Sequence, residues 1–505
     1  MNEVKKMKYC VNGEWKTSKA EKYYDVTDSS TGELLAQVPS CTKEEVEEAI
    51  ASAHEAYKSW SKLSLSRRTQ YLFTWRNVLM DHLEELTVLC AKELGKNLAE
   101  ARGDVLKAIE PTEFATGISF ASQGHASLNV TTGYDTATYR EPLGVVGGIV
   151  PFNFPAMIPW GWMVPLALAT GNTVVLKANT LTPLTSMRML ELFYEEAKFP
   201  KGVVNLVTCS RHEAEILLTD PRVKAITFVG TTKVGKHIYS LASANGKRVQ
   251  AQCEAKNHAL LLEDADLESA TKAIINSTYG CAGMRCMALP VIVVQESIAD
   301  RFVALLKEKA QAMKVGCAYD ENTDLGPVVS QEHKDSIVRW IDQGVKEGAE
   351  LVLDGRDIVV PGYEGGYFVG PTIFDHVTEE MSVGTQEIFG PVTLIKRVKD
   401  FEEGLKVMND NPFANGSVIF TQSGYYAREF EMRTDGGMVG INVGIPVPTA
   451  YFPFSGNKDS FFGDLHVLGA DGVRFYTRAK TVTKHWFDDR SKYREVGTWE
   501  GSVDR

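Results

Sequence analysis

The chain has 505 residues, of which 44% are hydrophobic and 24% charged, and its formal net charge is −11 at neutral pH. This length is too great for one ordinary core and predicts two or three domains, and the composition is that of a soluble globular protein. The acidic balance argues against nucleic acid or an anionic membrane as a partner. A small substrate remains compatible, because its site can be locally basic inside an acidic protein.

The eight cysteines are scattered along the chain and form no C-x-x-C pair. That density is too low for a disulfide scaffold, so we expect reduced thiols in a cytoplasmic protein, and we expect no metal site. The first residues, MNEVKKMKYCVNGEW, lack the apolar stretch of a signal peptide. The longest uncharged apolar stretch, around residues 144–171, is interrupted by Asn153 and four prolines, so we expect no membrane span.

The N-terminal part predicts a small hairpin followed by two long helices. Turn pairs near positions 12 and 31 indicate the hairpin. The spacing of Thr42 and Glu45 predicts a capping box that begins a helix running to about Trp60. A second amphipathic helix is predicted over about 66–95.

The middle of the chain alternates short apolar runs with helical stretches, which predicts parallel strands covered by helices on both faces. After residue 264 the alternation restarts with a helix to Gly280, a strand over 290–295 and a helix over 299–315, so two α/β units in series are expected. Polar alternating segments at 126–142 and 474–485 are predicted to pair as an extra antiparallel unit that bridges subunits. The apolar runs are VVGGIV (145–150), TVVLK (173–177), VVNLV (203–207), AITFV (225–229), RVQAQ (248–252) and ALLLE (259–263).

A strand-to-helix turn at FVGTTKVG (228–235) is a possible dinucleotide contact, although the usual G-x-G-x-x-G fingerprint is absent. Gly230 and Gly235 flank the first helical turn, whose free N–H groups would suit a pyrophosphate. Taken alone, the segment is more simply explained as a turn capped by a threonine.

Cys286 lies in GCAGMRCM (280–287), a turn of small residues before a strand. Glycines allow close approach of a ligand, and Arg285 would favour a nearby thiolate. Most free cysteines are buried structural residues, and Cys281 and Cys253 compete with Cys286 on composition alone.

Other polar residues next to the predicted strands have two interpretations each. Asn153, in PFNFP after the first core strand, could donate to an oxyanion or hold its own proline-rich loop. Glu387 in EIFGP could accept from ribose hydroxyls while Phe389 packs on a ring, or the segment could be only a turn. Lys177 ends TVVLK and could contact a cofactor or be solvated.

Together these segments resemble the aldehyde dehydrogenase superfamily, in order and spacing along nearly the whole chain, and most closely its methylmalonate/malonate-semialdehyde dehydrogenase subfamily. The resemblance implies an α/β fold with a Rossmann-like dinucleotide-binding domain (1–125 and 145–262), an α/β catalytic domain (263–465) and a small β oligomerisation element (126–144 and 466–490). It also implies a homodimer or homotetramer. The matching segments are PFNFPAMIP (151–159), GNTVVLK (171–177), GKRVQ (246–250), AKNH (255–258), GMRCMA (283–288), GGYFVGPTIF (365–374), NPFANGSVIFT (411–421), PFSGNKDSFFGDLH (453–466) and FYTRAKTVT (475–483).

By this resemblance, Cys286 is the nucleophile, and the Asn153 amide and the Cys286 N–H form the oxyanion hole. The implied reaction is attack of the thiolate on an aldehyde, hydride transfer to NAD and an acyl-thioester on Cys286. The implied NAD contacts are Lys177 for the adenosine ribose, Gly230, Thr231 and Gly235 for the pyrophosphate, Glu387 for the nicotinamide ribose, Phe389 for the nicotinamide, and Phe152, which stands where many relatives carry Trp.

The acyl acceptor depends on positions 252 and 254. Hydrolytic members carry a glutamate base where this chain has Gln252, and glutamine cannot take a proton usefully. Water then lacks the base it needs, whereas a thiol with a pKa near ~8.5 is already partly ionised, so coenzyme A is favoured. On a continuous strand, Glu254 would face the same side as Gln252 and could restore the base. The alternative is therefore a hydrolytic enzyme for another aldehyde.

Four further positions depart from or define the pattern. Lys107 aligns with one of two arginines that recognise the substrate carboxylate, while Arg285 keeps the second, so a sulfonated or longer anionic aldehyde is also compatible. Thr180 replaces a ribose-binding glutamate, which makes NADP conceivable beside NAD. Met284 replaces a polar residue, with no clear consequence.

Two other classes of protein are also weighed against these residues. A cysteine hydrolase or acyltransferase without redox chemistry would need a histidine beside the nucleophile, and none is evident. A non-catalytic assembly protein on the same fold would not need Cys286, Asn153, Glu387 and Lys177 together.

Overall fold

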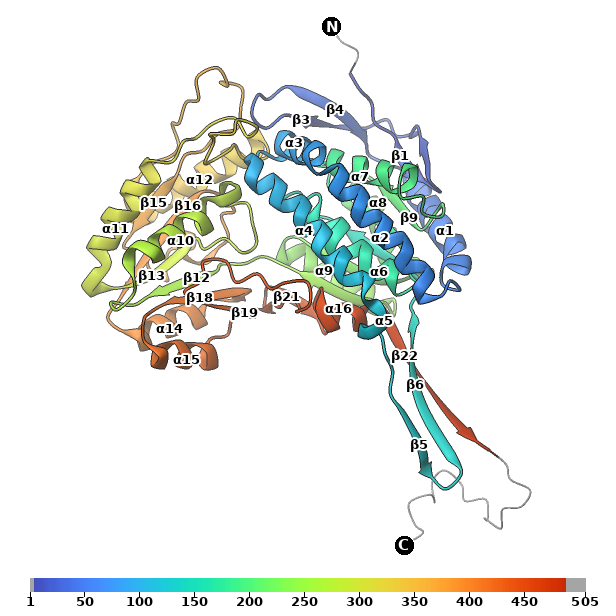
Figure 1. The fold of residues 1–505 in the computed structure, drawn as a ribbon. Coiled ribbons are helices and arrows are strands. Elements are labelled where there is room, and N and C mark those ends of the chain that lie inside the picture. Colours follow the sequence, from blue (N-terminus) through green and yellow to red (C-terminus); the bar gives the residue numbers. More distant parts are fainter. Residues whose placement is uncertain (1–3, 487–505) are drawn as a thin grey trace.

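The protein has two α/β lobes and a narrow β arm (Figure 1). The structure is a computed structural model and describes residues 4–486. The eight-stranded sheet of the first lobe has the order β2-β1-β9-β8-β7-β10-β11-β21. The seven-stranded sheet of the second lobe has the order β14-β15-β16-β13-β12-β18-β19. The inner strands of both sheets pair in parallel, which confirms the two α/β units expected in series.

The strands of the first sheet are β1 (Tyr9–Val11), β2 (Glu14–Lys16), β7 (Val145–Ile149), β8 (Thr173–Lys177), β9 (Val204–Val207), β10 (Val223–Val229), β11 (Arg248–Gln252) and β21 (Phe461–Gly463). Those of the second are β12 (His258–Leu261), β13 (Val291–Gln295), β14 (Glu350–Leu353), β15 (Thr372–Asp375), β16 (Val392–Val398), β18 (Gly416–Phe420) and β19 (Met438–Ile441). Two short antiparallel pairs lie outside the two large sheets: β3 (Tyr23–Thr27) with β4 (Leu34–Pro39), and β17 (Phe413–Ala414) with β20 (Asn457–Lys458).

The helices of the first lobe are α1 (Lys43–Trp60), α2 (Leu65–Asp81), α3 (Leu83–Leu94), α4 (Leu98–Thr116), α5 (Ile118–Ala121), α6 (Val164–Ala169), α7 (Leu184–Glu195), α8 (Arg211–Thr219), α9 (Thr232–Ala244) and α16 (Gly469–Phe475). Those of the second are α10 (Leu267–Tyr279), α11 (Glu296–Gln311), α12 (Gln331–Glu347), α13 (Ser382–Thr385), α14 (Phe401–Asp410) and α15 (Gly424–Arg433). No helix within residues 4–486 is both long and apolar enough to cross a bilayer.

Local signals predicted the first helix correctly. Glu45 N–H donates to Thr42 Oγ1 at 3.4 Å, and Thr42 N–H donates to Glu45 Oε2 at 2.9 Å, which is the reciprocal capping box. The helix ends at Trp60, as expected. The long helix expected over 66–95 is instead two helices that meet at His82, and α3 ends before Gly95, which has the left-handed conformation of a C-terminal cap.

The boundary between the lobes differs from the one expected. The run at 259–263 was assigned to the dinucleotide-binding domain, but β12 lies in the seven-stranded sheet, so the chain changes sheet in the linker 253–257. In turn β21, expected in the catalytic domain, pairs antiparallel with β11 of the first sheet. A linker of five residues between two sheets places its side chains at the junction of the lobes.

The arm confirms the predicted pairing of two segments far apart in sequence. Strands β5 (Ala126–Thr131) and β6 (Tyr134–Pro142) form a hairpin, and β22 (Thr477–His485) pairs antiparallel with β6 along its whole length. The arm projects away from both lobes (Figure 1). The expected C-terminal segment of this element, 466–490, begins with helix α16 rather than a strand, and its last four residues lie outside the described residues.

Candidate active site

Cys286 differs from the other cysteines in its exposure. Of the chain's eight cysteines, all within the described residues and none in a disulfide, seven are buried and only Cys286 is partly exposed. Cys281 and Cys253, its competitors on composition, lie inside the core. A nucleophile must reach a substrate, so the structure favours Cys286 over both.

The loop before Cys286 has an unusual backbone. Cys281, Ala282 and Gly283 have φ angles of 53°, 51° and 71°, so three successive residues are left-handed, a conformation that costs energy for the two residues with side chains. A Cβ atom on Gly283 would lie 2.1 Å from the Gly390 carbonyl oxygen. Only glycine therefore allows the Cys286 loop to contact the segment that follows Phe389.

Two buried asparagines hold this loop. Asn257 donates from Nδ2 to the carbonyls of Cys286 and Ala288, both at 2.8 Å, and accepts at Oδ1 from Gly416 N–H at 2.8 Å. Asn415 donates from Nδ2 to the same Cys286 carbonyl at 3.0 Å. Buried and fully engaged amides of this kind fix a backbone in one position.

Asn153 reaches the same loop from the other lobe. It follows β7, is 4% exposed, and donates from Nδ2 to the Met284 carbonyl at 3.2 Å. Its loop is anchored by Asp104, which accepts from Met157 N–H at 2.7 Å and pairs with the buried Lys96 ammonium at 3.0 Å. The amide is thus held two residues from Cys286, and its second N–H remains available to an oxyanion.

Glu387 and Phe389 lie in the segment that the Cys286 loop contacts through Gly283 and Gly390. Glu387 Oε1 accepts from the backbone N–H of Ala255 at 3.1 Å. Phe389 has a left-handed φ of 59° and packs edge-on against Phe152, with ring centroids 5.7 Å apart. His333 completes the aromatic group and hydrogen-bonds to the Phe389 carbonyl at 2.8 Å. Backbone strain of this kind is typical of binding sites.

The charges of the site are mutually dependent. Burial first, and the Glu387 carboxylate second, raise the pKa of the Cys286 thiol to about 12, whereas the Cys286 N–H and Arg285 oppose the rise. Burial also raises the pKa of Glu387 to about 8, against the hydrogen bond from Ala255. With a pKa of about 8, the Glu387 carboxyl is largely neutral at neutral pH and the thiol is protonated, so activation of the thiol requires that positive charge approach it.

The carboxyl edge of the first sheet leaves polar groups without partners. Burial lowers the pKa of Lys177 at the end of β8, and its ammonium makes no hydrogen bond to any described residue. The Thr180 side chain, in the following loop, is partly exposed and has no hydrogen bond within residues 4–486. A half-buried cation and a free hydroxyl in the loop that follows the same strand fit the ribose hydroxyls of a dinucleotide.

The two glycines of the strand-to-helix turn are required for packing. A Cβ on Gly230 would lie 2.5 Å from the Phe228 ring, and one on Gly235 would lie 2.2 Å from Cys253 Sγ. Thr231 is the N-cap residue of α9 but makes no side-chain capping bond. These residues therefore let α9 lie close to the sheet, at the edge that also carries Lys177.

Comparison with known proteins agrees with this geometry. The aldehyde dehydrogenase family profile matches residues 15–482. The chain belongs to the aldehyde dehydrogenase family. It is 48% identical over 483 residues to malonate-semialdehyde dehydrogenase 2 of Oceanobacillus iheyensis, covering 96% of this chain and 99% of that protein. It is 46% identical over 486 residues to malonate-semialdehyde dehydrogenase of Bacillus subtilis, covering 96% of this chain and 99% of that protein.

Solved structures give the same relationship. The methylmalonate-semialdehyde dehydrogenase of Oceanimonas doudoroffii superposes with a TM-score of 0.94 at 39% identity, covering 96% of this chain and 99% of that one. A Sinorhizobium meliloti protein assigned to the same enzyme type and solved in complex with NAD also has a TM-score of 0.94, at 37% identity, covering 97% of this chain and 99% of that one. The aldehyde dehydrogenase fold expected from the sequence is confirmed.

Within this aldehyde dehydrogenase fold, Gln252 and Glu254 make different contacts. Strand β11 ends at Gln252, so the alternation used to pair the two residues does not extend to Glu254. The Gln252 amide is buried, donates to the Phe454 carbonyl at 3.3 Å, and has a buried Oε1 with no partner within the described residues. The Glu254 carboxylate instead accepts from Thr232 N–H at 2.9 Å and caps helix α9.

The two cations expected to bind a substrate carboxylate are already engaged. Lys107 pairs with Glu110 at 2.6 Å. The Arg285 guanidinium donates to the carbonyls of Asn276 and Ser277 in the last turn of α10, while its Nε–H is buried without a partner among the described residues. No role was predicted from the sequence for Met284, which stands where relatives have a polar residue. In the structure its side chain is fully buried and its carbonyl accepts a hydrogen bond from Asn153.

Sequence reasoning missed Asn257, Asn415 and the neighbouring Lys256 as parts of the site. Two of them stand in AKNH and one in NPFANGSVIFT, segments that already supported the family resemblance. The available signal was a polar amide beside a short apolar strand. Such a residue must find partners when buried, but these partners lie between 29 and 159 positions away and cannot be predicted from local spacing.

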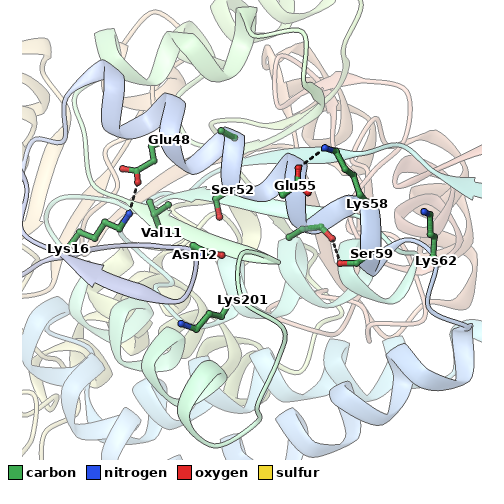
Figure 2. Close-up of a pocket in the computed structure, with 12 residues that line it drawn as sticks. Val11, Asn12, Lys16, Glu48, Ser52, Glu55, Lys58, Ser59, Lys62 and Lys201 are labelled. Carbon is green, nitrogen blue, oxygen red and sulfur yellow. Dashed lines mark hydrogen bonds and ion pairs between the residues drawn. The ribbon is translucent and has the colours of Figure 1, made fainter.

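A hollow of about 840 Å³ lies elsewhere, between α1 and the β1–β2 hairpin (Figure 2). Its lysines are mostly paired: Lys16 with Glu48 and Lys58 with Glu55, each at 2.5 Å. No residue of the aldehyde dehydrogenase site lines it. We therefore place the chemistry at Cys286 and not in this hollow.

Proposed function

We propose that the protein oxidises malonate semialdehyde or a close anionic relative to an acyl-thioester on Cys286 and transfers the acyl group to coenzyme A. The observation that carries this proposal is the position of Cys286: it is the one cysteine open to a ligand, and its loop contacts both Asn153 and the segment of Glu387 and Phe389. The names of the relatives support the substrate class.

The residues present fit a nicotinamide dinucleotide. The unpartnered Lys177 ammonium and Thr180 would bind the adenosine ribose, Glu387 the nicotinamide ribose, and Phe152 and Phe389 would border the ring. Gly230, Thr231 and Gly235 would line the diphosphate. When bound, the oxidised nicotinamide supplies a two-electron acceptor and a positive charge. We propose NAD as the cofactor, with NADP the alternative that Thr180 permits.

The protein's own groups carry out the covalent steps. The Cys286 thiolate forms a carbon–sulfur bond to the aldehyde carbon, and the carbonyl electron pair moves to oxygen, where the Asn153 amide and the Cys286 N–H donate to it. Each donor is worth about 3 kcal/mol in such sites. Loss of hydride from the same carbon restores the carbonyl and leaves the acyl-thioester.

Release of the acyl group requires a second nucleophile. Gln252 accepts no proton, and Glu254 is engaged at the N-terminus of α9. The thiolate of coenzyme A needs no base once ionised: its sulfur attacks the acyl carbon, its proton goes to solvent, and Cys286 leaves as thiolate. This arrangement favours coenzyme A over water.

Substrate charge would be recognised by Arg285. Its Nε–H is the donor left over from the contacts with α10, whereas the Lys107 ammonium is neutralised by Glu110. We also propose a homodimer or homotetramer formed through the arm, and a cytoplasmic location, supported by eight free cysteines.

The test is an assay of reduced nicotinamide formation with malonate semialdehyde, with and without coenzyme A. We expect turnover at least about tenfold higher with coenzyme A, and an acyl-coenzyme A product by mass spectrometry. Equal turnover without coenzyme A would contradict the acyl-transfer proposal. Propanal, which lacks the carboxylate, is the matched substrate, and equal kcat/KM for both aldehydes would contradict the role of Arg285.

A further inference from the structure

Helix α4 holds two loops of the active site through two carboxylates on one face. From its first turn, Glu100 Oε1 accepts from the backbone N–H of Cys281, in the loop that leads to the nucleophile, at 2.7 Å. Asp104 Oδ1 accepts from the backbone N–H of Met157, in the loop of Asn153, at 2.7 Å. The two carboxylates stand four residues apart, which places them on the same side of the helix. One helix therefore contacts both the nucleophile loop and the loop of the oxyanion donor.

The bond from Glu100 continues as a chain of hydrogen bonds to Asn153. The Cys281 carbonyl accepts from the Met284 N–H at 2.9 Å, and the Met284 carbonyl accepts from Asn153 Nδ2 at 3.2 Å. The loop of Asn153 returns to α4 through Asp104. These contacts form a closed ring. Within the described residues, the Glu100 bond is the only hydrogen bond of that ring between α4 and the turn before Met284.

The turn that Glu100 holds is a strained one. Cys281 and Ala282 have left-handed φ angles of 53° and 51°. Such a backbone persists only where surrounding contacts fix it. Cys281 is 4% exposed, so water has little access to replace the carboxylate at its N–H, and a buried N–H without an acceptor is unfavourable. Glu100 is therefore the contact that makes this conformation of the turn favourable.

The first turns of α4 are themselves fixed in place. Asn97 caps the helix and donates from Nδ2 to the Asp324 carbonyl at 2.9 Å. Asp104 pairs with the Lys96 ammonium at 3.0 Å, and both side chains are fully buried. The same ammonium lies 3.3 Å from the centroid of the Phe154 ring, in the oxyanion-donor loop. The helix is thus a rigid support from which a carboxylate can set the position of a loop.

The charge of Glu100 has a second possible role, which the test must separate from the hydrogen bond. Burial raises the pKa of Glu100, whereas Arg285, the Cys281 N–H and Lys96 oppose that rise. Neither cation forms an ion pair with Glu100 in the part of the chain that the structure describes. The direct contact of the carboxylate is the one to the Cys281 N–H.

We propose that Glu100 is a positioning residue for the oxyanion hole. By accepting from the Cys281 N–H, it holds the left-handed turn and so aligns the Cys286 N–H with the Asn153 amide on one oxyanion. The inference rests on the proposed function, in which these two groups are the donors. Glu100 contacts neither substrate nor cofactor, so its loss slows the chemical step without weakening cofactor binding.

The test compares three replacements of Glu100 in the full-length enzyme, assayed with malonate semialdehyde, NAD and coenzyme A. Glu100→Ala removes the acceptor and should lower kcat about 30-fold, while the Kd for NAD by calorimetric titration changes less than about twofold. Glu100→Gln keeps an oxygen at the same reach and should retain kcat within about threefold. Glu100→Asp keeps the charge but withdraws the oxygen by one methylene, and should lose about as much as Glu100→Ala. The reverse order, with Glu100→Asp active and Glu100→Gln impaired, would show that the charge facing Arg285 matters instead and would overturn the inference.

The control is Glu45→Ala. It removes another buried carboxylate that binds a backbone N–H, that of Lys19 at 2.7 Å, but at the N-terminal cap of α1. This variant should lower Tm and leave kcat within about twofold. An equal loss of kcat in Glu45→Ala would show general damage and overturn the inference. If Glu100→Ala does not fold, the order of Glu100→Gln and Glu100→Asp still decides.

A double variant with Asn153→Ala tests the alignment itself. In that background a single donor remains, so Glu100→Ala should lower kcat by less than about threefold further. A further 30-fold loss there, or an unchanged kcat in Glu100→Ala alone, would overturn the inference while turnover by the wild type still stands. Absence of NAD-dependent turnover by the wild type would overturn the proposed function, and the inference with it.

Discussion

The Cys286 loop and the carboxyl edge of the eight-stranded sheet meet at one site but are stabilised differently. Around Cys286 the protein satisfies its own groups: two buried amides hold the Cys286 carbonyl, and Asn153 holds that of Met284. At the sheet edge, the Lys177 ammonium and Gln252 Oε1 have no partner among the described residues. The Cys286 loop, which carries the proposed nucleophile, is thus held by the protein itself, whereas the sheet edge keeps polar groups without a protein partner. The exception is the N-terminus of α9, which Glu254 already caps.

The largest effect is expected when the proposed nucleophile, Cys286, is removed. Cys286→Ala should lower turnover more than about 1,000-fold, because no other exposed thiol can form the thioester. The control is Cys41→Ala, a fully buried cysteine at the start of α1, which should keep activity with a modest loss of stability. Trapping with a slow aldehyde followed by mass spectrometry should place the adduct on Cys286. Residual turnover near wild type in Cys286→Ala would contradict the assignment.

Removal of the Asn153 amide tests whether the Cys286 loop is held ready for the oxyanion before substrate binds. Asn153→Ala should lower kcat about 100-fold through loss of one oxyanion donor, with the Kd for NAD changed less than about threefold. The reason for the split is that Asn153 contacts the Met284 carbonyl and not the edge that carries Lys177. A loss of NAD affinity as large as the loss of kcat would show that the amide acts on the cofactor side instead.

The acyl acceptor is tested at Gln252. Gln252→Glu introduces a carboxylate where hydrolytic relatives have their base, so turnover without coenzyme A should rise about tenfold. At saturating NAD, Glu254→Gln should leave the ratio of rates with and without coenzyme A unchanged, because the Glu254 carboxylate binds Thr232 N–H. If that ratio rises in Glu254→Gln, Glu254 is a base after all and the coenzyme A proposal is weakened.

These outcomes also bear on what a single sequence can predict. The capping box of Thr42 and Glu45 follows from a pattern within one segment, and the pairing of β6 with β22 from the polar alternation that two distant segments share; both were predicted. The break at His82 was missed because the apolar periodicity continues across it. The change of sheet at 253–257 was missed because β11 and β12 have the same apolar character and differ only in which strands they pair with.

The residues of the candidate site likewise fall into those that were predicted from the sequence and those that were missed. Cys286, Asn153 and Glu387 were identified through segments that resemble a family. Their supports were not, because Asn257 and Asn415 act through hydrogen bonds to a loop distant in sequence. The expectation that Gln252 and Glu254 face the same side used strand alternation, which holds only as far as β11, and β11 ends at Gln252.

The charge of Glu387 gives a smaller effect on the nucleophile. Burial first, and the Glu387 carboxylate second, raise the pKa of the Cys286 thiol to about 12. Alkylation of Cys286 by iodoacetamide should therefore accelerate with pH up to the highest pH tested. At about pH 9, where a Glu387 carboxyl with a pKa of about 8 is ionised, Glu387→Gln removes a negative charge, lowers the thiol pKa and should accelerate alkylation about threefold. Slower alkylation in Glu387→Gln would show that Glu387 promotes ionisation of the thiol instead.

The smallest effect is expected at Glu254, where two consequences of one change oppose each other. The Glu254 carboxylate caps α9, so Glu254→Gly should cost about 0.5–2 kcal/mol of unfolding free energy. The same change frees the Thr232 N–H for a cofactor phosphate and removes a negative charge that faces Glu387. The Kd for NAD should therefore fall about threefold although Tm falls. Glu254→Gln separates the two effects, because it keeps a capping oxygen without the charge: a tighter Kd with little change in Tm is expected. Weaker binding of NAD in both variants would show that the Glu254 carboxylate helps to build the dinucleotide site. The N-terminus of α9 would then no longer be an exception, and the whole sheet edge would differ from the Cys286 loop in keeping its polar groups for a ligand.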